Sequence, residues 1–155
     1  RVLKKRATLR AMHILERTDK TEAQLRRKLE ESEYPKEAVE SAIAYVTSYG
    51  YLDDRRYAEH YIEWKKQGKG KARLKMQLVQ KGISREIIEE VLESTDFGET
   101  REMIRQIILK KRKTDIPMNE KEKQRLYGFL MRKGFSSSDI LAVMREEEWR
   151  NNTEF

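Results

Sequence analysis

The chain has 155 residues, of which 39% are charged and 37% are hydrophobic, and its net charge at pH 7 is +7. It contains no cysteine, which excludes disulfides and zinc sites with cysteine ligands. No apolar run is long enough to cross a membrane, and the first residues lack a signal-peptide core, so we expect a cytoplasmic protein without membrane contacts.

The first three predicted helices follow one another closely. The first is expected from Val2 to Arg17, where one face carries the apolar residues Leu3, Ala7, Ala11, Ile14 and Leu15. Thr21 and Gln24 have the spacing of a capping box and predict the start of a second helix. Pro35 favours the first turn of a third helix, which we expect to stop at Gly50.

The middle of the chain predicts three more helices. The first begins with Asp53 or Asp54 as its N-cap and is broken by Gly68 and Gly70. Residues 71–81 form the next helix, and Ser84 caps the one after it.

The last third of the chain repeats this organisation. Apolar residues at 103–108 share one helical face, and a connector runs through Pro117. Asn119 and Ser136 are the expected N-caps of the last two helices. Residues 151–155 are expected to form a flexible tail.

One apolar pattern returns three times, starting at Leu25, Leu74 and Leu126, with apolar residues at +4, +9, +14, +17 and +18. No segment alternates with the period of a strand. The sequence therefore predicts an all-α protein, a tandem array of three three-helix repeats that forms an elongated, curved rod. The predicted repeats are residues 1–49, 50–96 and 97–150.

The turn between the second and third helix of each repeat carries a further expectation. Gly82 and Gly134 follow a helix and precede a packing residue, so both should have a positive φ. The equivalent residue of the first repeat is Glu33, so we expect that turn to close differently, through Tyr34 and Pro35.

Two runs of basic residues form the candidate contact surface for a polyanion or an acidic groove. The first run consists of Lys65, Lys66, Lys69, Lys71, Arg73 and Lys75. The second consists of Lys110, Lys111, Arg112 and Lys113 and continues with Lys121, Lys123, Arg125, Arg132 and Lys133. The alternatives are a solvated basic surface and, for the second run, neutralisation of a helix dipole.

Aromatic residues lie just before the first basic run. Trp64 falls outside the apolar register of its helix, so it either stacks on a base, packs against a partner or shields a seam between repeats. Tyr57 and Tyr61 are expected in the core.

The sequence has no pattern typical of a catalytic or metal site. No phosphate loop, nucleophile elbow or pair of catalytic acids is present. Asp53 and Asp54 are better explained as helix caps than as metal ligands. We therefore expect a binding protein that has no catalytic residues, no cofactor and no small-molecule substrate.

Two motifs carry a resemblance to a known family. The first consists of Gly50, Tyr51, Leu52, Asp53, Asp54, Tyr57 and Ala58, and the second of Lys81, Gly82 and Ile83 after the segment 70–74. With the triple repeat, these motifs resemble the RecX family of bacterial RecA regulators.

The resemblance implies a monomer of three-helix repeats that binds RecA and the groove of the RecA–DNA filament. It implies inhibition or modulation of the recombinase, ATPase and co-protease activities of RecA, and only weak binding to single- or double-stranded DNA. Two alternatives stay open: a helical-repeat protein that acts on nucleic acid without RecA, and a scaffold for an unrelated protein. The sequence leaves open whether the filament groove, the filament end or free RecA is the main target.

Overall fold

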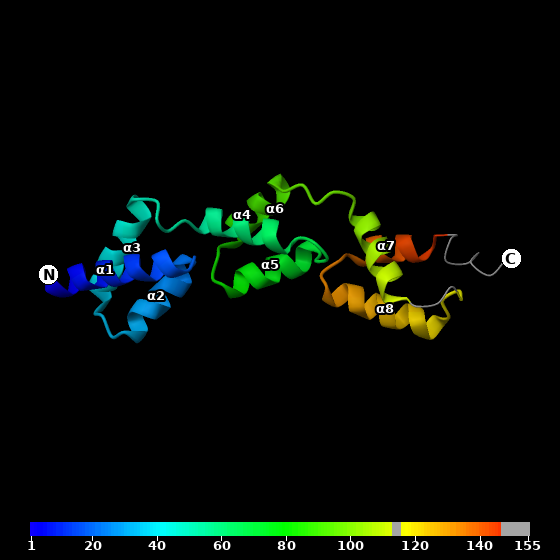
Figure 1. The fold of residues 1–155 in the computed structure, drawn as a ribbon, viewed down its shortest axis with the longest axis horizontal. Coiled ribbons are helices and arrows are strands. Elements are labelled where there is room, and N and C mark those ends of the chain that lie inside the picture. The colour runs from blue at the N-terminus through cyan, green and yellow to red at the C-terminus, as the bar shows by residue number, and fades with distance from the viewer. Residues whose placement is uncertain (113–115, 147–155) are drawn as a thin grey trace. The chain divides into compact units, whose positions relative to one another are not determined.

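The structure is a computed structural model that describes residues 1–112 and 116–146. All secondary structure within these residues is α-helical, which confirms the predicted all-α class (Figure 1). The helices described are α1 (Val2–Arg17), α2 (Glu22–Glu31), α3 (Lys36–Ser48), α4 (Asp54–Lys65), α5 (Lys71–Gln80), α6 (Arg85–Ser94), α7 (Thr100–Lys111), α8 (Glu120–Arg132) and α9 (Ser137–Met144).

The helices begin where the sequence places capping residues. The Thr21 hydroxyl accepts a hydrogen bond from the Gln24 amide, and the Gln24 side chain accepts one from the Thr21 amide, both at 3.1 Å. Asn119 and Ser136 accept hydrogen bonds from backbone amides of the first turns of α8 and α9. Asp53 caps α4, because its carboxylate accepts the Arg56 amide at 3.1 Å. Each cap satisfies a donor that the helix itself leaves without a partner.

The turns after α2, α5 and α8 share one geometry. Gly82 and Gly134 have φ values of 91° and 96°, as predicted. Glu33 has a φ of 66°, so the prediction that the first turn closes differently is wrong. In each turn the amide after the left-handed residue bonds a carbonyl near the end of the helix, at 3.4 Å for Tyr34, 3.2 Å for Ile83 and 3.2 Å for Phe135.

The helices pack into two compact units. Unit 1 comprises Arg1–Tyr61 and Gln77–Ser94, and unit 2 comprises Ile62–Met76 with the residues from Thr95 on. The predicted repeat boundaries fall in the α3–α4 and α6–α7 connections. The two units do not follow these boundaries, because the residues of the middle repeat are divided between them.

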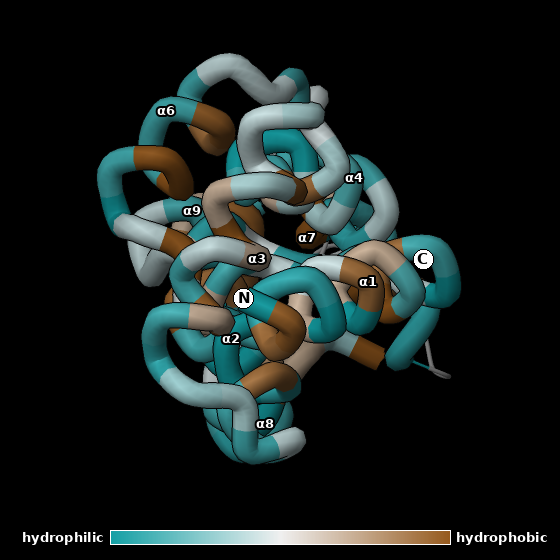
Figure 2. Tube along the Cα trace, turned by 90° about the vertical axis from the view of Figure 1, so that its left-hand side faces the viewer, coloured by the Kyte–Doolittle hydropathy of each residue, from teal (hydrophilic) through white to brown (hydrophobic). Residues whose placement is uncertain are grey.

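Each unit has an apolar core built from helix faces. In unit 1, α1 packs mainly on α3, and Ala7, Ala11 and Val46 are fully buried. Unit 2 buries Ile104, Ile108, Leu130, Ile140 and Val143, among others. Hydrophobic and hydrophilic residues accordingly alternate along single helices (Figure 2).

The sequence prediction of the core needs correction at three residues. Leu3, placed on the buried face of α1, is 47% exposed. Tyr57 and Tyr61 are only half-buried; their rings stack on each other, and the Tyr61 hydroxyl donates to Gln77 Oε1 at 2.8 Å. Their hydroxyl ends explain this position, since a phenol needs a polar partner or water.

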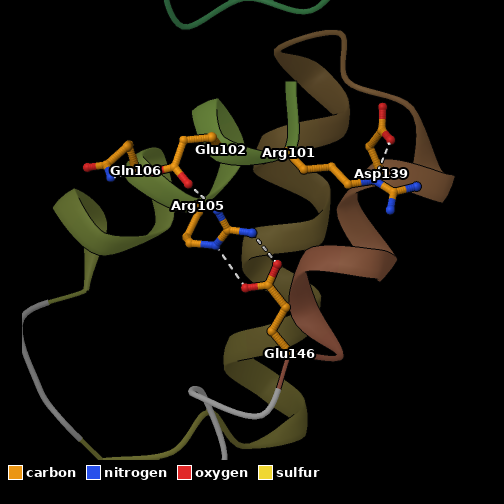
Figure 3. A network of polar contacts seen from close by, with 6 residues as sticks. All are labelled: Arg101, Glu102, Arg105, Gln106, Asp139 and Glu146. Carbon is orange, nitrogen blue, oxygen red and sulfur yellow. Dashed lines mark hydrogen bonds and ion pairs between the residues drawn. The ribbon is translucent and has the colours of Figure 1, made fainter. Parts of the chain in front are cut away.

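Ion pairs in unit 2 join α7 to α9 and to Glu146, which follows α9. Arg105 pairs with Glu146, with its Nε donating at 2.8 Å, and also with Glu102 (Figure 3). Arg101 donates to Asp139 at 3.0 Å. Hydrogen bonding to Glu146 raises the pKa of Arg105, and Glu146 is therefore part of the packing rather than a solvated charge.

Candidate functional site

A seam inside unit 1 joins the start of α2 to the turn after α5. The buried Thr21 hydroxyl donates to the Lys81 carbonyl at 2.6 Å. The Asp54 carboxylate accepts the Glu22 amide at 2.8 Å. A Cβ at Gly82 would lie 2.3 Å from the Ala23 Cβ, so only glycine fits at this turn.

A second seam, inside unit 2, joins the start of α5 to the turn after α8. The Gly70 amide donates to the Lys133 carbonyl at 2.7 Å, and the Ala72 amide donates to the Gly134 carbonyl at 3.3 Å. A Cβ at Gly70 would lie 2.1 Å from the Gly134 carbonyl oxygen. A Cβ at Gly134 would lie 2.3 Å from the Arg73 nitrogen. The two backbones therefore pack directly against each other.

The two seams use equivalent positions of the repeat. Thr21 and Gly70 each stand four residues before the first leucine of the apolar pattern. Lys81 and Lys133 each precede the glycine of the turn, and in both seams their carbonyl accepts a hydrogen bond. The repeated lysine–glycine pair is therefore a docking element, whose lysine carbonyl binds the preceding repeat.

Four cations gather at the unit 2 seam, and we call them the seam cluster: Lys65, Lys69, Arg73 and Lys133. Burial lowers the pKa of the Lys69 ammonium, and the charges of Lys65, Arg73 and Lys133 lower it further. Arg73 Nη1 donates to the Arg132 carbonyl at 3.1 Å, which fixes the guanidinium on this seam. Lys133 belongs to the predicted second basic run, and the seam places it beside cations of the first run, about 60 residues away along the chain.

Trp64 lies at the edge of the seam cluster. Its side chain is 73% exposed, and the Lys65 ammonium sits 3.9 Å from the centroid of its ring. The interpretation of Trp64 as a surface residue therefore holds, whereas a role in shielding a seam does not fit this exposure.

A second aromatic ring extends this surface on α8. The ammonium groups of Lys111 and Lys133 lie 4.0 Å and 5.3 Å from the centroid of the Phe129 ring. Phe129 also lines a cavity of about 550 Å³ together with Lys111, Arg125 and Arg132. The side of unit 2 that carries the seam cluster thus alternates cations with aromatic rings.

Other basic residues of the predicted surface have structural partners. Lys66 pairs with Glu63 and donates to the Asp96 carbonyl, both at 2.9 Å. The side chain of Arg112 is 4% exposed and pairs with Glu122 at 2.9 Å. Lys71 lies over the Phe97 ring, with its ammonium 5.1 Å from the centroid. These contacts hold unit 2 together.

The remaining predicted residues lie on the surface or outside the described residues. Lys110, Lys121 and Arg125 are exposed, Lys75 is half-buried on α5, and Lys123 pairs with Glu120 at 3.8 Å. Lys113 lies outside the residues that the structure describes.

Net charge divides sharply between the two units. Over the sequence, unit 1 has 15 lysines and arginines against 15 acidic residues, and unit 2 has 19 against 12. The excess of +7 thus belongs entirely to unit 2, whereas a count by sequence gives +3 for residues 1–49, +1 for residues 50–96 and +3 for residues 97–155. This concentration makes unit 2 the better candidate for contact with an anionic partner.

Comparison with known families covers all three groups of helices. Residues 7–45, 53–92 and 99–144 match the family models for the first, second and third three-helix domains of RecX. The chain belongs to the RecX family. The three-helix repeats predicted from the apolar pattern are therefore the three domains of this family.

Curated RecX relatives agree with this assignment. The chain is 36% identical to Regulatory protein RecX of Clostridium acetobutylicum, over 94% of this chain and 71% of the relative. It is 35% identical to that of Clostridium tetani, where it spans 64% of the relative's length. The RecX protein of Shigella boydii is 34% identical, with 92% of this chain and 89% of the relative covered.

Solved RecX structures share the fold. The crystal structure of RecX from Lactobacillus salivarius superimposes with a TM-score of 0.82 at 20% identity, covering 92% of this chain and 95% of that one. A second crystal structure, of regulatory protein RecX, gives a TM-score of 0.81 at 26% identity, covering 93% and 72%.

The motifs that carry the RecX resemblance are structural in this chain. Gly50 holds the turn after α3 with a φ of 74°, and Leu52 and Ala58 are buried. Tyr51 is 48% exposed and stacks on Tyr49. Asp54, Lys81 and Gly82 belong to the unit 1 seam, and Ile83 is buried next to it. The described residues contain no cluster of three potential metal ligands, and no described helix has both the length and the apolar character of a membrane span.

Proposed function

We propose that this chain is a non-enzymatic regulator of RecA that binds the RecA–DNA filament and inhibits or modulates its recombinase, ATPase and co-protease activities. The observation that carries the proposal is membership of the RecX family over three consecutive domains, together with relatives named Regulatory protein RecX. The proposal places the protein in the bacterial cytoplasm, as a monomer without a cofactor.

The charge distribution supports a polyanionic target. A RecA–DNA filament presents phosphates and protein surfaces at regular intervals, and unit 2 offers a group of cations on two segments that backbone hydrogen bonds hold together. Repeats that contact successive filament subunits would add modest affinities through avidity, so a single strong site is not needed.

Direct action on nucleic acid without RecA is the second candidate function. The exposure of Trp64 beside the seam cluster favours it, because aromatic rings beside cations are typical of single-strand binding surfaces. The two functions differ in the preferred target. A RecA regulator binds filaments more tightly than bare DNA, whereas a direct nucleic-acid binder does not need RecA.

Binding measurements with matched DNA test the proposal. The affinity of the chain for RecA filaments on a fluorescent single strand should exceed its affinity for the same strand alone by at least about 10-fold at near-physiological salt. Equal affinities would favour direct action on nucleic acid and would contradict filament recognition.

A further inference from the structure

We propose that unit 2 carries a binding site for a single nucleic-acid strand, in which Trp64 stacks on a base while the seam cluster binds the adjacent phosphates. The inference rests on the proposed function and deepens it, because it assigns this surface to the nucleic-acid component of the target rather than to RecA. Its test omits RecA, so the two proposals can fail separately.

The first argument is that three of the four cations in the seam cluster have no carboxylate partner among the described residues. Lys65, Arg73 and Lys133 form no ion pair with a carboxylate in residues 1–112 and 116–146. Lys69 already feels their repulsion, which adds to burial in lowering its pKa. Like charges held together in this way are stabilised by an anion that lies between them, and phosphate is the anion that a nucleic acid repeats along its backbone.

The second argument is that the backbone segments carrying these cations are fixed relative to each other. The hydrogen bonds from Gly70 to Lys133 and from Ala72 to Gly134 join the two segments that carry Lys69 and Lys133. The close glycine contact leaves no room for these segments to separate or slide without losing both bonds. The backbone positions of Lys69, Arg73 and Lys133 are thus set before binding, so no backbone ordering entropy is lost when a charged strand binds.

The third argument concerns Trp64. An indole that is 73% exposed buries little surface in the folded chain, so it contributes little to stability where it stands. The Lys65 ammonium lies against this ring, so one residue links the ring to the seam cluster. A base on the indole would therefore have its own phosphates within reach of the same cations.

The combination distinguishes a strand from an acidic protein surface. The carboxylates of an acidic protein surface would bind the cations but would make no use of an exposed aromatic ring. A nucleic-acid strand offers phosphates for the cations and a flat base for the ring. Phe129, with Lys111 and Lys133 around its ring, continues the alternation of rings and cations on the same unit. Duplex DNA fits less well, because its bases are already stacked and cannot reach Trp64.

Fluorescence of Trp64 gives a direct test. Trp149 is replaced by phenylalanine (W149F), which leaves Trp64 as the sole tryptophan, and an oligothymidylate of about 15 nucleotides is added without RecA. Trp64 emission should be quenched at saturation. Trp64→Ala should weaken binding about 10-fold, and Trp64→Phe should restore most of the affinity because phenylalanine also stacks.

An abasic strand of the same length separates stacking from charge. Parent and Trp64→Ala should bind this strand equally, because it offers phosphates without bases. Neutralising Lys69, Arg73 and Lys133 to glutamine should reduce the slope of log affinity against log salt by about 2, since about 0.7 ions per phosphate are released from a single strand. The matched control replaces three exposed cations of unit 1, Arg17, Lys28 and Lys36, with glutamine and should leave the slope nearly unchanged.

Three results would overturn the inference. One is an unquenched Trp64 with unchanged affinity of Trp64→Ala. Another is an equal loss of affinity for the abasic and normal strands. The third is a seam-cluster variant that binds oligothymidylate like the parent but no longer binds RecA filaments, which would assign the surface to an acidic patch of RecA. Circular dichroism of each variant confirms that it folds.

Discussion

Gly70 and Gly134 come from different repeats, yet a Cβ on Gly70 would lie only 2.1 Å from the Gly134 carbonyl oxygen. The Gly70 amide bonds the neighbouring Lys133 carbonyl, so this contact is both tight and hydrogen-bonded. It brings the backbone segments that carry Lys69, Arg73 and Lys133 together. The packing of two repeats and the proposed contact surface therefore depend on the same backbone contact.

Replacing Gly134 with alanine should destabilise the protein. The added Cβ would lie 2.3 Å from the Arg73 nitrogen, which overpacks the seam. Residue 134 also has a φ of 96°, a left-handed conformation that is unfavourable for alanine. We expect a loss of about 2–4 kcal/mol of unfolding free energy, measured by urea denaturation. Gly98→Ala is the control, because Gly98 has a φ of 69° with open space around it and should cost only about 1 kcal/mol. Equal losses in the two variants would mean that close approach at the seam does not matter.

Replacing Glu33 with glycine should have the opposite effect. Glu33 is exposed and has a φ of 66°, a conformation that costs a residue with a Cβ about 1–2 kcal/mol and costs glycine little. We expect a gain of about 0.5–1 kcal/mol in thermal or urea unfolding, reduced from the full strain by the greater freedom of glycine in the unfolded chain. Glu30→Gly, inside α2, should instead lose about 1 kcal/mol. A Glu33→Gly variant less stable than the parent would refute the strain argument.

Thr21→Val should lower the free energy of unfolding by more than the loss of an ordinary helix cap does. The hydroxyl caps α2 and also donates to Lys81 across the unit 1 seam, in a fully buried position. Valine keeps the shape but leaves the Lys81 carbonyl and the Gln24 amide without this partner, at a cost of about 2–3 kcal/mol. Ser136→Ala, which removes a cap on α9 alone, should cost about 1 kcal/mol. If the two losses are the same, the seam hydrogen bond contributes nothing.

The buried carboxyl group of Asp54 should make the stability of the protein depend on pH. Burial raises the pKa of its carboxyl above the ordinary value of 3.8, so between that pH and the folded pKa the native state binds more protons than the unfolded state. Stability attributable to Asp54 therefore falls as pH rises through this window. Asp54→Asn keeps an acceptor for the Glu22 amide and carries no charge.

We compare the unfolding free energies of the parent and Asp54→Asn at about pH 3.5 and at pH 7. From the lower to the higher pH, the parent should lose stability relative to the variant. The other carboxyl groups are common to both proteins and cancel in the difference. A parent that gains on the variant with rising pH would show that the seam favours the charged carboxylate.

The local part of this fold could be predicted from sequence. Helix starts at Thr21, Asn119 and Ser136 depend on hydrogen bonds to amides three residues away, and such signals lie within one turn. The prediction for the turn at Glu33 is wrong because it assumes that a positive φ requires glycine. At Gly82 and Gly134 the closeness of another repeat excludes a Cβ, whereas Glu33 is exposed.

The candidate site was less predictable, because it depends on contacts between distant segments. The runs of lysine and arginine predict Lys66 and Arg112 as contact residues. In the structure these side chains pair with Glu63 and Glu122 instead. Lys133 joins the seam cluster only through a backbone contact with residue 70. Charge density along the chain indicated the region, but the packing decides which cations remain at the surface.

The central claim, regulation of RecA, is tested most directly by the DNA-dependent ATPase activity of RecA. With filaments on single-stranded DNA at near-physiological salt, ATP hydrolysis should fall as the chain is titrated in. The Lys65, Lys69, Arg73 and Lys133 to glutamine variant should need a several-fold higher concentration for the same effect, and its circular dichroism should show that it keeps its helices. ATP hydrolysis that stays constant at saturating parent protein, with strand exchange also unaffected, would contradict the account.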